Sequence, residues 1–194
     1  METEIRIIKH LIENRKEFTI RELSKSIKSD YKITHTAVKR LIDKDIISSK
    51  NIGKSILIKF KDKLAKEVLE VEFVRREDIL KNKNIKVMLD NIKNNIKTVG
   101  YILILFGSYA KKIESAKSDI DLIFIVSNIK IEKEIDSAIS LLPLNIHHHV
   151  FLEKQFLNMK NSQESNIVTE AIKNNVILHG IEGFYELINK GGSI

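Results

Sequence analysis

The chain has 194 residues, which allows one large domain or two small ones. Hydrophobic residues make up 43% of the chain and charged residues 30%, which supplies ordinary cores and excludes a wholly disordered protein. Cysteine is absent, so disulfides and thiolate metal sites are excluded. No apolar run is long enough to cross a bilayer and no signal segment begins the chain, so a cytoplasmic protein without a membrane partner is expected.

The net charge of +7 is unevenly distributed along the chain. Residues 1–60 carry 14 Lys/Arg and 8 Asp/Glu (net +6), residues 61–97 carry 10 and 7 (net +3), and residues 98–194 carry 9 and 11 (net −2). A basic first third indicates that one part of the chain contacts a polyanion while another part does something else. A general bias toward Lys, Ile and Asn is the competing explanation.

Residues 1–60 predict three helices followed by a β-hairpin. Apolar residues recur at helical spacing over residues 4–14, 21–27 and 34–44. Thr19 and Glu22 can form a capping box at the second helix. Two extended segments then flank a loop that contains Gly53. This order predicts a winged helix, and the stretch FTIRELSKSIKSDYKITHTAVKRLIDKDII resembles the winged helix-turn-helix domains of prokaryotic regulators.

The third helix of such a domain enters the major groove of double-stranded DNA, while lysines of the hairpin contact phosphates. The candidate DNA-binding residues are Thr34, His35, Thr36, Lys39 and Arg40 on the helix and Lys50 and Lys54 on the hairpin. Between residues 28 and 60 there are 8 Lys/Arg and 3 Asp/Glu, which favours nucleic acid. A protein-binding or dimerisation module is the alternative, and a homodimer is expected if the domain reads paired half-sites.

Residues 61–97 predict two helices, over residues 62–80 and 85–96, that connect the two functional ends. The charged run over residues 75–78 is interpreted as a solvated helix face without a chemical role. The domains are therefore predicted at residues 1–60, 61–97 and 98–194.

The last segment carries the residues expected to do chemistry. An apolar strand over residues 99–106 leads into Gly107 and Ser108, and Asp119 and Asp121 precede a second apolar strand. Glycine permits a sharp turn and a close approach to a ligand, and Ser108 with helix-start N–H groups can hold phosphate oxygens. Residues two apart in a strand share a face, and such paired carboxylates suit Mg²⁺. Lys111 could contact a triphosphate or be a solvated lysine.

The stretch FGSYAKKIESAKSDIDLIFIV resembles the nucleotidyltransferase superfamily of the DNA polymerase beta type, in particular its small "minimal" members of archaea and bacteria. The resemblance covers about residues 98–185. It implies an α/β (α+β) fold with a small mixed sheet flanked by helices, and ATP or another nucleoside triphosphate as substrate with Mg²⁺ or Mn²⁺. It places phosphates at Gly107 and Ser108 and metal ions at Asp119 and Asp121, and Lys111 stays a candidate nucleotide-binding residue because of its position between them. Some small relatives adenylylate a partner toxin, so a protein acceptor is one expectation beside a nucleic-acid hydroxyl.

The sequence departs from this family pattern at one position. Active members usually carry a third carboxylate on the following strand, but residues 145–151 contain no acid. His147 is the expected equivalent, and Asn145 is the second choice because the register is uncertain by one pleat. A neutral imidazole can act as a base or ligand, although it suits transition metals better than Mg²⁺.

Three hypotheses about function follow from the sequence. The first is a metal-dependent nucleotidyltransferase targeted by a winged helix. The second is a DNA-binding transcriptional regulator whose degenerate domain senses a nucleotide without turnover, and the third is a scaffold for assembly. The sequence does not identify the acceptor.

Overall fold

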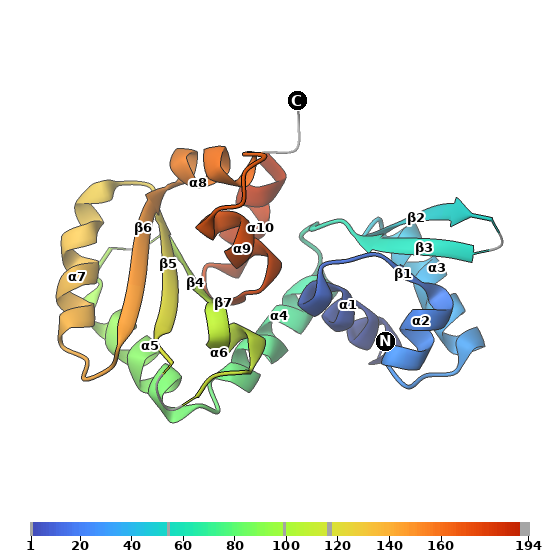
Figure 1. Ribbon diagram of the computed structural model, residues 1–194, viewed down its shortest axis with the longest axis horizontal. Helices are drawn as coiled ribbons and strands as arrows, with labels where there is room; N and C mark the ends of the chain where they lie inside the picture. The colour runs from blue at the N-terminus through green and yellow to red at the C-terminus, as the bar shows by residue number, and fades with distance from the viewer. Residues whose placement is uncertain (1, 54, 99, 116–117, 191–194) are drawn as a thin grey trace. The chain divides into compact units, whose positions relative to one another are not determined.

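Figure 1 shows the computed structural model of the chain, which describes residues 2–53, 55–98, 100–115 and 118–190. The chain divides into two compact units, residues 1–73 and residues 74–194. The first unit contains helices and a small antiparallel sheet, and the second contains helices around a mixed four-stranded sheet, so the predicted mixed α/β fold class is confirmed. Among the described residues, no helix is both long and apolar enough to span a membrane.

The first unit follows the predicted order of three helices and a hairpin. Its elements are α1 (Glu2–Asn14), β1 (Phe18–Thr19), α2 (Ile20–Ser26), α3 (Tyr31–Asp43), β2 (Ile47–Ile52) and β3 (Ser55–Phe60). Strand β3 pairs antiparallel with both β1 and β2. The capping box of α2 is present, because the Glu22 N–H donates to Oγ1 of Thr19 (3.2 Å) and the Thr19 N–H donates to Oε2 of Glu22 (2.8 Å).

Helix α3 begins at Tyr31 rather than at the predicted Thr34. The Asp30 carboxylate accepts hydrogen bonds from the N–H groups of Lys32 (2.8 Å) and Ile33 (3.2 Å). These bonds satisfy two of the donors that a helix start leaves without an intrahelical partner. The sequence prediction began this helix at residue 34 and so missed its first turn.

The predicted connector contains α4 (Lys66–Ile79) and α5 (Lys83–Asn95). The division between the two compact units falls within α4, and the buried side chains of α5 belong to the core of the second unit. The domain boundaries at residues 60 and 97 stay predictions.

The charged run over residues 75–78 is not wholly a solvated face. Arg75 is only 6% exposed, and its guanidinium donates a hydrogen bond to the backbone carbonyl of Asn175. A buried charged donor requires such an acceptor, because its desolvation is otherwise uncompensated. The interpretation was wrong for Arg75 because its acceptor lies 100 residues further along the chain and leaves no local pattern.

The second unit is built around one sheet. After α5 its elements are β4 (Tyr101–Phe106), α6 (Gly107–Lys111), β5 (Ile120–Val126), the 3-10 helix η1 (Ile129–Ile131), α7 (Glu132–Ser140), β6 (Ile146–Leu152), α8 (Glu153–Lys160), α9 (Ile167–Lys173), β7 (Val176–His179) and α10 (Ile181–Lys190). The strand order is β6-β5-β4-β7. Strand β4 is antiparallel to both neighbours, whereas β5 and β6 are parallel and are joined by the crossover through α7.

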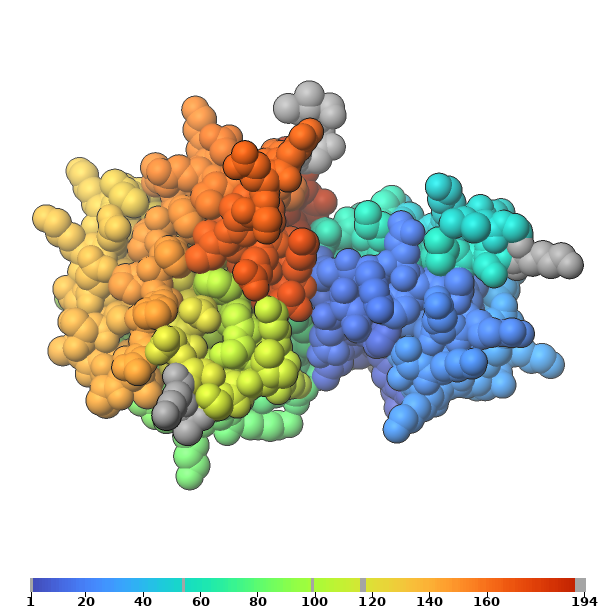
Figure 2. Space-filling model, in the orientation of Figure 1, coloured from blue at the N-terminus to red at the C-terminus, as the bar shows by residue number. Residues whose placement is uncertain are grey.

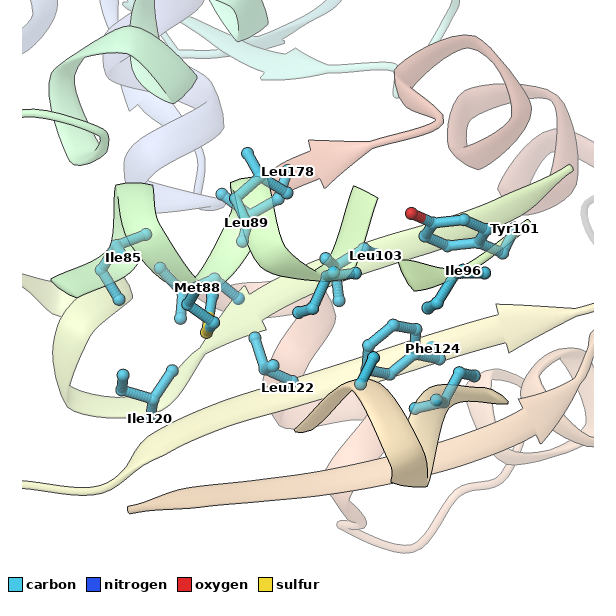
Figure 3. Packing of buried hydrophobic residues seen from close by; sticks show 14 of the residues in the cluster. Ile85, Met88, Leu89, Ile96, Tyr101, Leu103, Ile120, Leu122, Phe124 and Leu178 are labelled. Carbon is cyan, nitrogen blue, oxygen red and sulfur yellow. The ribbon is translucent and has the colours of Figure 1, made fainter. Parts of the chain in front are cut away.

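Helices cover both faces of this sheet, with α5 and α7 on one face and α8, α9 and α10 on the other (Figure 1). Figure 3 shows the core on the α5 side, and its labelled members are Ile85, Met88, Leu89, Ile96, Tyr101, Leu103, Ile120, Leu122, Phe124 and Leu178. Because β4 and β5 are buried on both faces, their sequences are almost continuously apolar instead of alternating.

Candidate active site

The strand register brings the predicted chemical residues to one end of the sheet. Phe106, the last residue of β4, lies opposite Asp121 of β5, and Asp121 lies opposite His147 of β6. The end of β4 therefore meets the beginnings of β5 and β6. The turn at Gly107, the Asp pair and His147 share this end.

Gly107 has a backbone conformation and a neighbour that both require glycine. Its φ is +70°, in the left-handed region that other residues rarely adopt. A Cβ on Gly107 would lie 3.0 Å from Cγ of Asp121 and closer still to its Oδ2. The missing side chain therefore makes room for the carboxylate of Asp121. The close neighbour of this glycine is thus a side chain of the site, and the close approach of a ligand to Gly107 stays a prediction.

Asp119 directly precedes β5 and Asp121 is the second residue of that strand, two positions further on. The side chains of Asp119 and Asp121 are 39% and 30% exposed, whereas Ile120 and Leu122 are buried in the core on the opposite side. Burial raises the pKa of Asp121, the charge of Asp119 raises it further, and His147 acts in the opposite direction. A nearby cation stabilises the ionised forms of two carboxylates that lie close together.

His147 faces the Asp pair from β6. Its Nδ1 lies 3.8 Å from Oδ2 of Asp119 and 4.0 Å from Oδ1 of Asp121. Asn145 precedes β6, and its backbone carbonyl accepts a hydrogen bond from the Ile120 N–H (2.9 Å). The structure thus places His147, rather than Asn145, opposite Asp121.

The next two histidines point to opposite faces of β6. His148 lies on the α7 side, where its Nε2 is 2.9 Å from Oδ1 of Asp136. His149 lies on the side of His147, and its charge lowers the pKa of Asp121. Its ring is stacked on Phe151, with 6.1 Å between the ring centroids. The polar face of β6 therefore continues beyond His147.

Lys111 contacts an acid that the sequence prediction missed. Its Nζ lies 3.1 Å from Oε1 of Glu170 in α9, and the charge of Glu170 raises the pKa of Asp121. Figure 2 shows the yellow-green surface near α6 adjoining the orange-red surface of α9. Glu170 is a single acid in a short helix far from Asp121 in sequence, so no local pattern indicates that it lies beside the site.

The donors at this end of the sheet fit a divalent cation. Mg²⁺ is usually held by one or two carboxylates together with substrate phosphates, and Asp119 and Asp121 supply such carboxylates. The imidazole of His147 suits a transition metal better than Mg²⁺. As the side chains lie, no group of three or more His, Asp or Glu among the described residues is placed to hold a metal ion.

The predicted DNA-binding residues lie in the first unit. Thr36, Lys39, Arg40 and Lys50 are exposed and His35 is half-buried. The prediction that Thr34 binds DNA was wrong, because Thr34 is completely buried and its hydroxyl donates to the backbone carbonyl of Asp30 (2.8 Å). The remaining candidate, Lys54, lies outside the described residues.

A mixed sheet that carries a Gly-Ser turn and an Asp pair at one end defines a nucleotidyltransferase-type unit. The family model described as "Polymerase beta, Nucleotidyltransferase" matches residues 83–182, more than half of the 194 residues. The chain therefore belongs to the polymerase beta nucleotidyltransferase family, whose members typically use a divalent metal ion and a nucleoside triphosphate. Neither the search of curated proteins nor the search of solved structures gave a match.

Proposed function

We propose that the protein transfers a nucleoside monophosphate from ATP or another nucleoside triphosphate to a hydroxyl group of a protein or nucleic acid, with Mg²⁺ or Mn²⁺ as cofactor. The observation that carries this proposal is the register of β4, β5 and β6. It gathers Gly107, the Asp pair and His147 at one end of the sheet, although the three elements are separated by loops and helices in the sequence.

In the proposed reaction, the oxygen of the acceptor hydroxyl bonds to the α-phosphorus, and the bond from that phosphorus to its bridging oxygen breaks. Pyrophosphate leaves with the electron pair of the broken bond. Asp119 and Asp121 would hold the divalent cation, which would stabilise the charge on the phosphates. Ser108 and the N–H groups that follow Gly107 hold phosphate oxygens. His147 accepts the proton of the acceptor hydroxyl, and a positioned general base contributes about 10²–10⁴-fold to a rate.

The composition of β6 favours a second candidate function. Its residues Ile146–Leu152 include no acid, and His147 occupies the position opposite Asp121. A site with a weaker affinity for Mg²⁺ can bind a nucleotide without transferring it. In this second proposal the protein is a transcriptional regulator, and nucleotide occupancy changes its affinity for DNA.

In both proposals the first unit binds double-stranded DNA. The exposed face of α3 carries Lys39 and Arg40, and the hairpin carries Lys50. Side chains of this kind neutralise phosphates and give salt-dependent affinity. A homodimer that reads paired half-sites stays a prediction.

The deciding experiment is transfer of label from α-labelled ATP in the presence of Mg²⁺ or Mn²⁺, with purified protein and host-cell extract. The enzyme proposal expects label on a macromolecule with the wild-type chain and none with the Asp119→Ala/Asp121→Ala double variant. Asp136→Ala is the matched control, because it removes an exposed carboxylate of the same unit from the opposite side of β6. Nucleotide binding without transfer would instead support the regulator, and neither binding nor transfer would reject both.

A further inference from the structure

Helix α3 exposes two large apolar side chains at its first turn. Tyr31 is 49% exposed and Ile33 is 56% exposed. The Asp30 cap fixes the backbone beneath them, and the ring of Tyr31 lies 6.0 Å from that of His35 between centroids. At 100° per residue, Tyr31 and Ile33 flank the exposed polar stripe that contains Lys32. This surface therefore offers apolar contacts on both sides of a cationic centre.

Each of these apolar side chains lines a hollow that also contains basic residues. Tyr31 lines one of about 740 Å³ with Arg21 and Lys25 of α2. Ile33 lines another, of about 360 Å³, with Lys32, Arg40 and Glu4, and Nη1 of Arg40 lies 3.6 Å from Oε1 of Glu4. The first turn of α3 thus lies between two hollows of one compact unit, and each hollow contains two basic side chains. A helix inserted into the major groove of a duplex has one phosphate backbone on each side.

The basic and the apolar side chains of this surface match different chemical groups of DNA. The lysines and arginines of the two hollows match phosphates, which carry no sequence information. Tyr31 and Ile33 offer apolar surface, and the C5-methyl group of thymine is the apolar group that marks an A·T pair in the major groove. The side chain of Ile33 has no donor for a hydrogen bond to guanine, so an apolar contact is the contact that it can make with a base.

We propose that Tyr31 and Ile33 read thymine methyl groups, so that the protein prefers A·T-containing duplexes through direct contact in the major groove. This inference rests on the proposed DNA binding of the first unit. It adds two residues that sequence reasoning left out, because the helix was predicted to begin after both of them. It also replaces Thr34, which is buried, as a reader of bases.

The test removes the methyl group and nothing else from the DNA bases. The affinity of the full chain is measured for a duplex of alternating A·T pairs and for the same duplex with uracil in place of every thymine. Each buried methyl contact is worth ~0.8 kcal/mol, so the uracil duplex is expected to bind about fourfold more weakly per methyl contacted. Ile33→Ala and Tyr31→Ala should each reduce this discrimination, whereas Ile33→Val should keep most of it.

Lys39→Gln supplies the matched control. It should weaken binding to both duplexes equally and reduce the salt slope by about one, while the ratio of the two affinities stays unchanged. Binding without discrimination between thymine and uracil, or discrimination that persists in both alanine variants, overturns this inference and leaves the proposed DNA binding intact. No binding to any duplex overturns both. Self-association that is lost in Tyr31→Ala and Ile33→Ala, without duplex binding, would assign the surface to a second copy of the chain.

Discussion

Replacing Gly107 by alanine tests whether this residue makes room for the Asp121 carboxylate. A left-handed backbone costs an L residue about 1–2 kcal/mol. The new Cβ would also overlap Asp121, and such overpacking typically costs a further 1–3 kcal/mol, approximately. Gly100→Ala is the matched control, because its φ of +96° carries the same kind of backbone penalty while a Cβ there would meet nothing within 4 Å. The difference between the two variants therefore isolates the overlap with the carboxylate.

Thermal unfolding and Mn²⁺ binding, followed by electron paramagnetic resonance, measure the two consequences separately. In a chain of this size, 1 kcal/mol corresponds to roughly 2–4 °C in Tm. We expect Gly107→Ala to melt several degrees below Gly100→Ala, at roughly that scale. We also expect it to lose Mn²⁺ binding and nucleotide transfer, whereas Gly100→Ala retains both. Equal Tm values and equal Mn²⁺ affinities in the two variants would refute the reasoning.

Three further predictions concern Asp121, His147 and Arg75. Because burial raises the pKa of Asp121 in the folded protein, its ionised form destabilises the metal-free fold. Asp121→Asn should therefore raise Tm at neutral pH. This gain in Tm should shrink as the pH falls through the folded-state pKa of Asp121 toward the ordinary pKa of an aspartate, about 3.9. A gain in Tm that grows on acidification would contradict this prediction. His147→Asp should increase Mg²⁺ affinity roughly tenfold by calorimetric titration, because Mg²⁺ prefers carboxylate oxygens, while His147→Asn should not. Arg75→Met should lower the free energy of unfolding in urea by about 1–3 kcal/mol, because the Asn175 carbonyl loses a buried donor. A change below about 0.5 kcal/mol would disprove that role.

Local signals predicted much of the fold. Helical spacing, the Thr19–Glu22 capping box and the hairpin around Gly53 each depend on residues close together in sequence, and the structure contains all of them. The first turn of α3 could have been found as well, since Asp30 is a good N-cap residue followed by helical spacing.

The rest depended on contacts between distant segments. Alternation along β6 puts Asn145 and His147 on the same face, so only the pairing of β6 with β5 could choose between them. That pairing is set by a crossover of about twenty residues, and no short-range pattern fixes its register. Glu170 beside Lys111, and the Asn175 carbonyl that accepts from Arg75, escaped prediction for the same reason.

The position of Arg75 within α4 determines how the two units can be separated for experiment. A chain that began at residue 74, where the compact units divide, would keep only residues 74–79 of the helix. So short a helix is marginal by itself, and Arg75 would fall in a fraying first turn. Its hydrogen bond to Asn175, next to β7, would weaken with it. An isolated nucleotidyltransferase unit should therefore be expressed from a residue before Lys66, so that the whole of α4 accompanies the sheet.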